Sequence, residues 1–340
     1  MVTGLYSGSV GVSVAKLDHG GGVHNAARRW GIPPHHWLDL STGISPWSWP
    51  VPAVPEHVWR RLPEDDDGLV DICREVLALP SNADCLPVPG SQAALQTLPL
   101  LRPRCRVGVP AVGYAEHAQA WARAGHEVIP LAYDRIEATL ATLDVLVCIN
   151  PNNPTGKLTD SETLLGWHQQ LLKRGGWLVV DEAFLDATEG QSLAPLSDRA
   201  GLIVLRSLGK FYGLAGLRAG LVTATPDLCS QMAQRLGPWA VNHPARFVMA
   251  KALTDADWKQ RQYQRITTAH QRLLTVLSDA GLQAEGDCGL FAWCKTDKAN
   301  ALAEALARQG VLVRLFPDVP ALRFGLPGHD RGWTQLAAAL

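Results

Sequence analysis

The sequence predicts an α/β fold: a large, mainly parallel β-sheet with helices on both faces, accompanied by a smaller α+β domain. From about residue 65, short apolar runs alternate with stretches of helical periodicity. The apolar runs are continuous, which is typical of parallel strands that are buried on both faces. A chain of 340 residues is also long enough for a large core and a second domain.

The elements follow one another in the order that such a sheet requires. The first 60 residues are rich in Gly, Pro, Trp and His, and predict irregular structure apart from a short helix near residues 25–30. Helical periodicity then marks residues 68–79, and a Gly-Ser pair opens a helix at residue 90. Beyond these we expect strands at 105–110, 126–131, 144–151, 177–184 and 202–208, with helices at 114–125 and 161–175.

The pattern changes near residue 226, where long helices begin. One helix is expected over residues 255–281, followed by shorter strand and helix segments. We therefore divide the chain into an N-terminal segment (residues 1–45), a large domain (46–225) and a small C-terminal domain (226–340). The N-terminal segment is expected to contribute to the small domain and to the substrate site.

Composition and charge exclude several classes of function. The net charge is −1, so the chain offers no basic surface for nucleic acid. Seven scattered cysteines without a CxxC pair argue against a disulfide framework or a zinc ribbon, and favour a reducing compartment. The apolar runs are too short to span a membrane, and the first residues do not resemble a signal peptide. We expect a cytoplasmic protein.

Four motifs lie just beyond expected strand ends, where the ligand sites of parallel sheets form. In "PGSQAAL", Gly90, Ser91 and Gln92 open a helix whose free N–H groups suit a phosphate, although such a start also serves as a simple cap. In "NPNNPTG", residues 150–156, two Asn-Pro steps make a rigid turn. A structural turn accounts for the prolines better than it accounts for three asparagines at a strand end.

The other two motifs supply a carboxylate and an amine. In "VVDEAF", Asp181 follows a buried strand and needs a partner, either an arginine or a cationic ring nitrogen. In "SLGKFYGLAGLRAG", Lys210 is a candidate nucleophile, and Ser207 and Arg218 could bracket an anion. The glycines of this stretch let the backbone pass close to a ligand.

Together these residue types describe a site for pyridoxal phosphate. The cofactor aldehyde needs a lysine amine, and its ring nitrogen needs a carboxylate to stay protonated. Its phosphate needs backbone N–H groups with arginine and hydroxyl donors, and its phenolic oxygen needs a neutral donor such as asparagine.

The chain resembles the fold-type I pyridoxal-phosphate enzymes, in particular the branch with histidinol-phosphate aminotransferases and threonine-phosphate decarboxylases. The three motifs "NPNNPTG", "DEAF" and "SLGKFYGLAGLRAG" occur in this order. The resemblance implies a homodimer that acts on a small phosphorylated amino acid. It implies that Lys210 binds the cofactor covalently, that Asp181 pairs with the ring nitrogen and that Asn153 pairs with the phenolic oxygen. It also implies that Tyr114 stacks on the ring and that Arg323 binds the substrate α-carboxylate. The residues implied to hold the cofactor phosphate are Ser91, Gln92, Ser207 and Arg218.

The N-terminal stretch "HGGGVHNAARRWGIPPHHWLDLSTGISP" resembles the decarboxylases of cobalamin biosynthesis. This implies α-decarboxylation of L-threonine O-3-phosphate, with His19 as a donor to the substrate phosphate and the backbone near Gly43 beside the carboxylate. Arg314 is either a second anion site or part of a structural salt bridge. An aminotransferase for a phosphorylated amino acid and a non-catalytic scaffold on the same fold remain as alternatives.

The sequence also departs from this branch. Gly43 and Ser45 stand where relatives carry asparagines, Leu62 stands where a tyrosine reaches the partner subunit's cofactor phosphate, and Phe184 replaces a tyrosine. These departures weaken the substrate assignment more than the cofactor assignment. The histidines at positions 19, 24, 35 and 36 have no metal-ligand spacing, so we expect no metal site.

Overall fold

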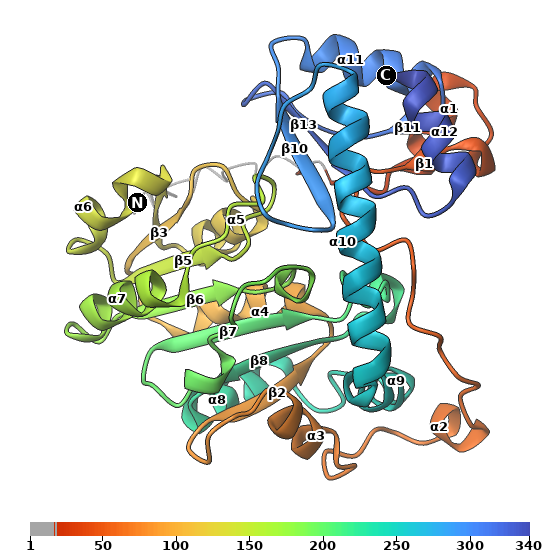
Figure 1. Ribbon diagram of the computed structural model, residues 1–340. Coiled ribbons are helices and arrows are strands. Elements are labelled where there is room, and N and C mark those ends of the chain that lie inside the picture. The colour runs from red at the N-terminus through yellow and green to blue at the C-terminus, as the bar shows by residue number, and fades with distance from the viewer. Residues whose placement is uncertain (1–16, 18) are drawn as a thin grey trace, which may run out of the picture.

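The structure is a computed structural model that describes Leu17 and residues 19–340 (Figure 1). It contains a seven-stranded sheet and a four-stranded sheet, and the long helix α10 (Ala256–Asp279) runs from one to the other (Figure 1). Within the described residues, no helix combines the length and the apolar character needed to cross a bilayer.

The seven-stranded sheet has the order β2-β8-β7-β6-β5-β3-β4. Strand β8 is antiparallel to both neighbours, and the other neighbouring pairs are parallel, so the prediction of a mainly parallel sheet is confirmed. The strands are β2 (Asp84–Val88), β3 (Arg106–Pro110), β4 (Glu127–Leu131), β5 (Val145–Ile149), β6 (Trp177–Asp181), β7 (Leu202–Ser207) and β8 (Gly220–Ala224). Our sequence analysis assigned no strand to β2 or β8.

Helices cover both faces of this sheet, which explains the continuous apolar runs. Successive side chains of a strand point to opposite faces. Val145 and Val147 therefore pack against one layer, while Leu146 and Cys148 pack against the other. The first layer contains α4 (Ser91–Thr97), α5 (Glu116–Arg123) and α8 (Pro226–Leu236), and the second contains α6 (Ile136–Leu140) and α7 (Ser161–Leu172).

The smaller portion is built on an antiparallel sheet of order β12-β13-β10-β9. Its elements are β9 (Ala284–Glu285), β10 (Phe291–Lys295), α11 (Ala299–Arg308), β12 (Arg314–Phe316), β13 (Ala321–Gly325) and α12 (Asp330–Ala339). The N-terminal segment supplies α1 (Val23–Trp30) and β1 (Leu38–Asp39), and β1 pairs in parallel with β11 (Val311–Leu312).

The N-terminal segment therefore lies with the smaller portion, while the chain after it runs beside α10 toward α2 (Glu56–Arg60) (Figure 1). Helix α8 packs against β2 and β8 of the large sheet, and α9 (His243–Thr254) packs against α2 and α3 (Leu69–Val76). These contacts associate the first part of residues 226–340 with the large portion. The exact domain boundaries stay a prediction.

Candidate active site

A cavity of about 530 Å³ lies where loops of the large sheet face β12 and β13. Its wall comes from the β3–α5 loop, the β5–α7 loop, the loop after β7, the N-terminal segment and the two small-domain strands. The volume is in the range of small-molecule sites. Six predicted site residues line it: His19, Tyr114, Asn153, Lys210, Arg314 and Arg323.

Lys210 lies in the loop that follows β7, and its backbone carbonyl accepts hydrogen bonds from Ser45 N at 3.0 Å and Gly213 N at 3.1 Å. Its Nζ atom is 5.1 Å from the centroid of the Phe184 ring. Burial, followed by the positive charge of Arg323, lowers the pKa of Lys210 to about 8. The side chain is therefore a far better nucleophile near neutral pH than an exposed lysine.

Asp181 ends β6, and its carboxylate is buried. Oδ1 accepts a hydrogen bond from Ala183 N at 3.0 Å, and Oδ2 lies 2.9 Å from His117 Nε2. Among the described residues, no arginine forms an ion pair with this carboxylate, so the arginine alternative for its partner is wrong. Our sequence analysis missed His117, which lies in the first turn of α5 with its ring centroid 6.3 Å from that of Tyr114.

Arg323 extends from β13 and is almost completely buried. Its Nη1 donates to Asn153 Oδ1 and its Nη2 donates to the carbonyl of Ser41 at 2.6 Å, while its buried Nε has no partner among the described residues. Burial lowers the pKa of Arg323 to about 10. Arg314 is its register partner on β12, so both guanidinium groups start from the same face of the sheet.

Gly43 is required by close packing beside Arg323. Its φ is +62°, and a Cβ atom there would lie 3.2 Å from the Phe291 ring, 3.3 Å from the Phe184 ring and 3.6 Å from Arg323 Cζ. The backbone of the N-terminal segment therefore approaches Arg323, and its role beside the substrate carboxylate stays a prediction. Phe184 and Phe291 pack edge to face at 5.2 Å, which gives Phe184 an apolar role in place of a phenol.

Ser45 has a clear structural role. Its Oγ accepts from Gln262 Nε2 at 2.7 Å, and the same Nε2 lies 3.0 Å from the carbonyl of Phe211. Gln262 belongs to α10 and is buried, so it joins the N-terminal segment to the loop that carries Lys210. Our sequence analysis did not single out Gln262, and a glutamine in a long polar helix gives no signal for this role.

A second group of predicted residues gathers around the start of α4. A Cβ atom at Gly90 would lie 2.7 Å from Arg218 Nη2, and one at Gly220 would lie 2.7 Å from Ser91 N. A side chain at position 90 would therefore collide with the guanidinium of Arg218, and a side chain at position 220 would collide with the N–H of Ser91. This pairing of donors suits a phosphate group.

Gln92 connects this group to the cavity. Its Oε1 accepts a hydrogen bond from Tyr114 Oη at 3.0 Å, and its Nε2 donates to Glu116 Oε2 at 3.0 Å. Burial, followed by the charge of Glu116, raises the pKa of Tyr114 to about 12, so the phenol stays neutral and can donate. Glu116 is a further residue that our sequence analysis did not identify.

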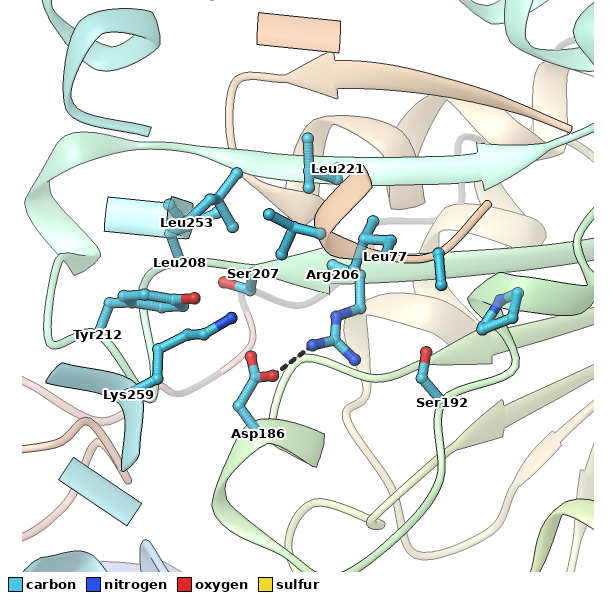
Figure 2. A pocket seen from close by; sticks show the side chains of 13 residues that line it. Leu77, Asp186, Ser192, Arg206, Ser207, Leu208, Tyr212, Leu221, Leu253 and Lys259 are labelled. Atoms are coloured by element: carbon cyan, nitrogen blue, oxygen red, sulfur yellow. Dashed lines mark hydrogen bonds and ion pairs between the residues drawn. The ribbon is translucent and has the colours of Figure 1, made fainter. Parts of the chain in front are cut away.

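Ser207 is the register partner of Gly220 and so lies next to the group at the start of α4, and it also lines a second cavity of about 270 Å³ (Figure 2). Its Oγ accepts from Gly209 N at 3.2 Å. The neighbouring Arg206 donates to Glu182 Oε2 at 2.9 Å and forms an ion pair with Asp186 (Figure 2). This buried network anchors β7 just before the loop, and the role of Ser207 in phosphate binding stays a prediction.

The residues present fit pyridoxal phosphate. Lys210 offers a nucleophilic amine, Asp181 offers a buried carboxylate, and Arg218 with Ser91 offers adjoining donors for the phosphate. Among the residues that the structure describes, no group of three or more His, Cys, Asp or Glu side chains could hold a metal ion.

A family model described as "Aminotransferase class I and II" matches residues 69–339. The chain is 48% identical over 325 residues to a threonine-phosphate decarboxylase of Pseudomonas aeruginosa, covering 95% of this chain and 97% of the relative. It is 40% identical over 338 residues to a threonine-phosphate decarboxylase of Sinorhizobium sp, covering 96% and 98%.

More distant relatives are histidinol-phosphate aminotransferases. One from Caldanaerobacter subterraneus is 32% identical over 52% of this chain and 50% of its own length. The solved structure of the Sinorhizobium meliloti histidinol-phosphate aminotransferase, in complex with pyridoxal-5'-phosphate, matches the fold with a TM-score of 0.84 at 20% identity, covering 99% of this chain and 97% of that one. The chain belongs to the family of class I and II aminotransferases, which have the fold-type I architecture.

Proposed function

We propose that this chain is a pyridoxal-phosphate enzyme that decarboxylates L-threonine O-3-phosphate to (R)-1-amino-2-propanol O-2-phosphate, as a step in cobalamin biosynthesis. The observation that carries the proposal is the similarity, over nearly the whole chain, to two relatives named threonine-phosphate decarboxylase. The sequence similarity to the Caldanaerobacter histidinol-phosphate aminotransferase covers only about half of the chain. The geometry of the cavity supports the same choice.

The cofactor, when bound, provides the aldehyde that Lys210 attacks and a ring that accepts the electron pair from Cα. Asp181, whose Oδ2 lies 2.9 Å from His117 Nε2, would keep a proton at the ring nitrogen. With the cofactor bound, Asn153 would donate to its phenolic oxygen and Tyr114 would cover its ring face. Gly90, Ser91, Gln92, Ser207 and Arg218 hold the cofactor phosphate.

The charges of the cavity match a substrate with two anionic groups. Lys210, Arg314 and Arg323 line it together with His19, while Asp318 is the only acidic residue among the described lining residues. Arg323 binds the α-carboxylate, because a guanidinium offers two parallel donors to a planar carboxylate. Arg314 and His19 bind the substrate phosphate. Fixing both ends of the substrate orients the Cα–carboxylate bond for cleavage.

The test is a product assay without any keto acid. The holoenzyme is incubated with L-threonine O-3-phosphate, and carbon dioxide and aminopropanol phosphate are measured. Both products should appear and should be lost in Lys210→Ala. If no carbon dioxide forms but amino transfer begins when 2-oxoglutarate is added, the proposal is wrong and the aminotransferase alternative holds. A colourless protein without bound cofactor would instead support the scaffold alternative.

We also propose that the chain forms a homodimer in the cytoplasm. Trp59, Leu62 and Trp239 are 66%, 61% and 58% exposed, which is unusual for large apolar side chains and suits cover by a second copy. All seven cysteines are free, as expected in a reducing compartment. Sedimentation equilibrium tests the dimer, and a monomer at micromolar concentration would contradict it.

A further inference from the structure

Glu116 is a nearly buried carboxylate at the first position of α5, and three side-chain donors surround it. Gln92 Nε2 and Gln96 Nε2 each donate to Oε2 at 3.0 Å. His19 Nε2 lies 2.9 Å from Oε1. The helix dipole further stabilises an acidic side chain at this position. The carboxylate is therefore fully paired, although it lies beside a site proposed to bind anions.

The three donors come from different parts of the protein. His19 belongs to the N-terminal segment, whereas Gln92 and Gln96 lie on α4, which begins at the proposed binding residues for the cofactor phosphate. Gln92 also accepts the hydrogen bond of Tyr114. Glu116 thus links His19 to Gln92, and through Gln92 to Tyr114.

This link determines which atoms of His19 remain for a ligand. An ionised carboxylate can only accept, so the bond to Glu116 uses the Nε2–H of His19. The remaining ring nitrogen of His19, Nδ1, is the one that can donate to a phosphate when the imidazole carries both protons. His19 and Tyr114 both line the cavity, with their ring centroids 6.1 Å apart. His19 itself is half exposed, so packing alone does not fix its orientation.

We propose that Glu116 is a positioning residue that orients His19 toward the phosphate group of the substrate. This inference rests on the proposed function, since it takes the substrate to be phosphorylated. Glu116 does not touch the substrate, and its effect is on the binding of the phosphate group. Around His19 the charged and titratable groups are Glu116 and Tyr114 on one side, and Arg314, Asp318, Lys210 and Arg323 in the same cavity wall.

The test compares Glu116→Gln with wild type as holoenzymes. Calorimetric titration with inorganic phosphate gives a Kd, and steady-state kinetics with L-threonine O-3-phosphate separate KM from kcat. The variant should weaken phosphate binding and raise KM by roughly tenfold, because a charge-assisted hydrogen bond becomes a neutral one. The kcat should stay within about threefold, because the bond that breaks at Cα is not affected. Glu127→Gln, the same change at an exposed pair with Arg106, is the matched control and should behave as wild type.

A double variant distinguishes positioning from a general structural effect. If Glu116 acts through His19, adding Glu116→Gln to His19→Ala should change the Kd for phosphate by less than about twofold. Additive effects, a wild-type Kd in Glu116→Gln, or a loss of cofactor and kcat with unchanged KM would overturn the proposal. The proposed function and the proposed role of Glu116 can fail independently. If the wild-type enzyme releases no carbon dioxide, the proposed function is wrong, and the phosphate titrations still decide whether Glu116 orients His19.

Discussion

The low pKa of Lys210 predicts how the protein takes up its cofactor. With a pKa of about 8, about a tenth of the Lys210 amine is neutral at pH 7, whereas a lysine at the ordinary value of 10.5 is about 0.03% neutral. Only the neutral amine attacks an aldehyde. At pH 7 Lys210 should therefore react with pyridoxal phosphate roughly 300-fold faster than an ordinary lysine of equal intrinsic reactivity.

The assay mixes apoenzyme with pyridoxal phosphate in a stopped-flow instrument and follows the absorbance of the lysine-bound cofactor between pH 6 and 10. The rate should rise about tenfold from pH 6 to 7 and about fivefold from pH 7 to 8, and should become constant above about pH 9. Nα-acetyl-lysine is the matched control, because its rate reports the titration of the cofactor together with that of an ordinary lysine amine. Dividing each rate by this control rate, after correction for the neutral fraction of the control amine, isolates Lys210.

The cause of the shift can be tested in the same assay. Burial is the largest cause and the charge of Arg323 is the next, and both disfavour the protonated amine. Arg323→Leu removes one positive charge, so the pH at which the rate becomes constant should move upward. If the wild-type rate still rises steeply above pH 9.5, Lys210 titrates as an exposed lysine and the reasoning is refuted.

Two further predictions concern Asp181 and Thr223. Asp181→Ala should still bind the cofactor covalently, as judged by absorbance, but should lose about 10²–10⁴-fold in turnover because the ring nitrogen loses its proton; near-normal turnover would mean that Asp181 does not face the ring. Thr223 is completely buried in β8, and its Oγ1 has no partner within the described residues. Thr223→Val should raise the free energy of unfolding by about 1 kcal/mol in urea denaturation, and a decrease would show that the hydroxyl is paired.

Much of the fold could be predicted because burial on both faces leaves a strong pattern. Strands such as β5 and β6 are apolar at nearly every position, and only a doubly covered strand needs that. Strand β2 was missed because Pro87 interrupts it, and a proline is tolerated there since β2 is at the edge of the sheet. Strand β8 was missed because a glycine-rich stretch precedes it and suggested turns.

The sequence indicated those site residues whose own functional group is expected to contact the cofactor or the substrate. Lys210 and Asn153 follow strands of the large sheet, as their motifs suggested, and they meet Arg323, which lies within β13, in one cavity. Partners that act through another residue were not predictable. His117 lies 64 positions from Asp181 in the sequence, and Arg323 binds a backbone carbonyl of Ser41, which no residue type can indicate.

Arg323, which is proposed to bind the substrate carboxylate, is hydrogen-bonded to Asn153, which is proposed to bind the cofactor. Arg323 Nη1 donates to Asn153 Oδ1, so each side chain partly satisfies the other. Binding a substrate carboxylate through Nη1 requires Arg323 to exchange this acceptor for a carboxylate oxygen. Nη2 can keep its hydrogen bond to the Ser41 carbonyl during the exchange, because each terminal nitrogen of the guanidinium carries two N–H groups. A carboxylate at Nη1 would replace a neutral acceptor by a charged one, which strengthens the hydrogen bond, and it would leave the Asn153 side chain free to orient toward the cofactor.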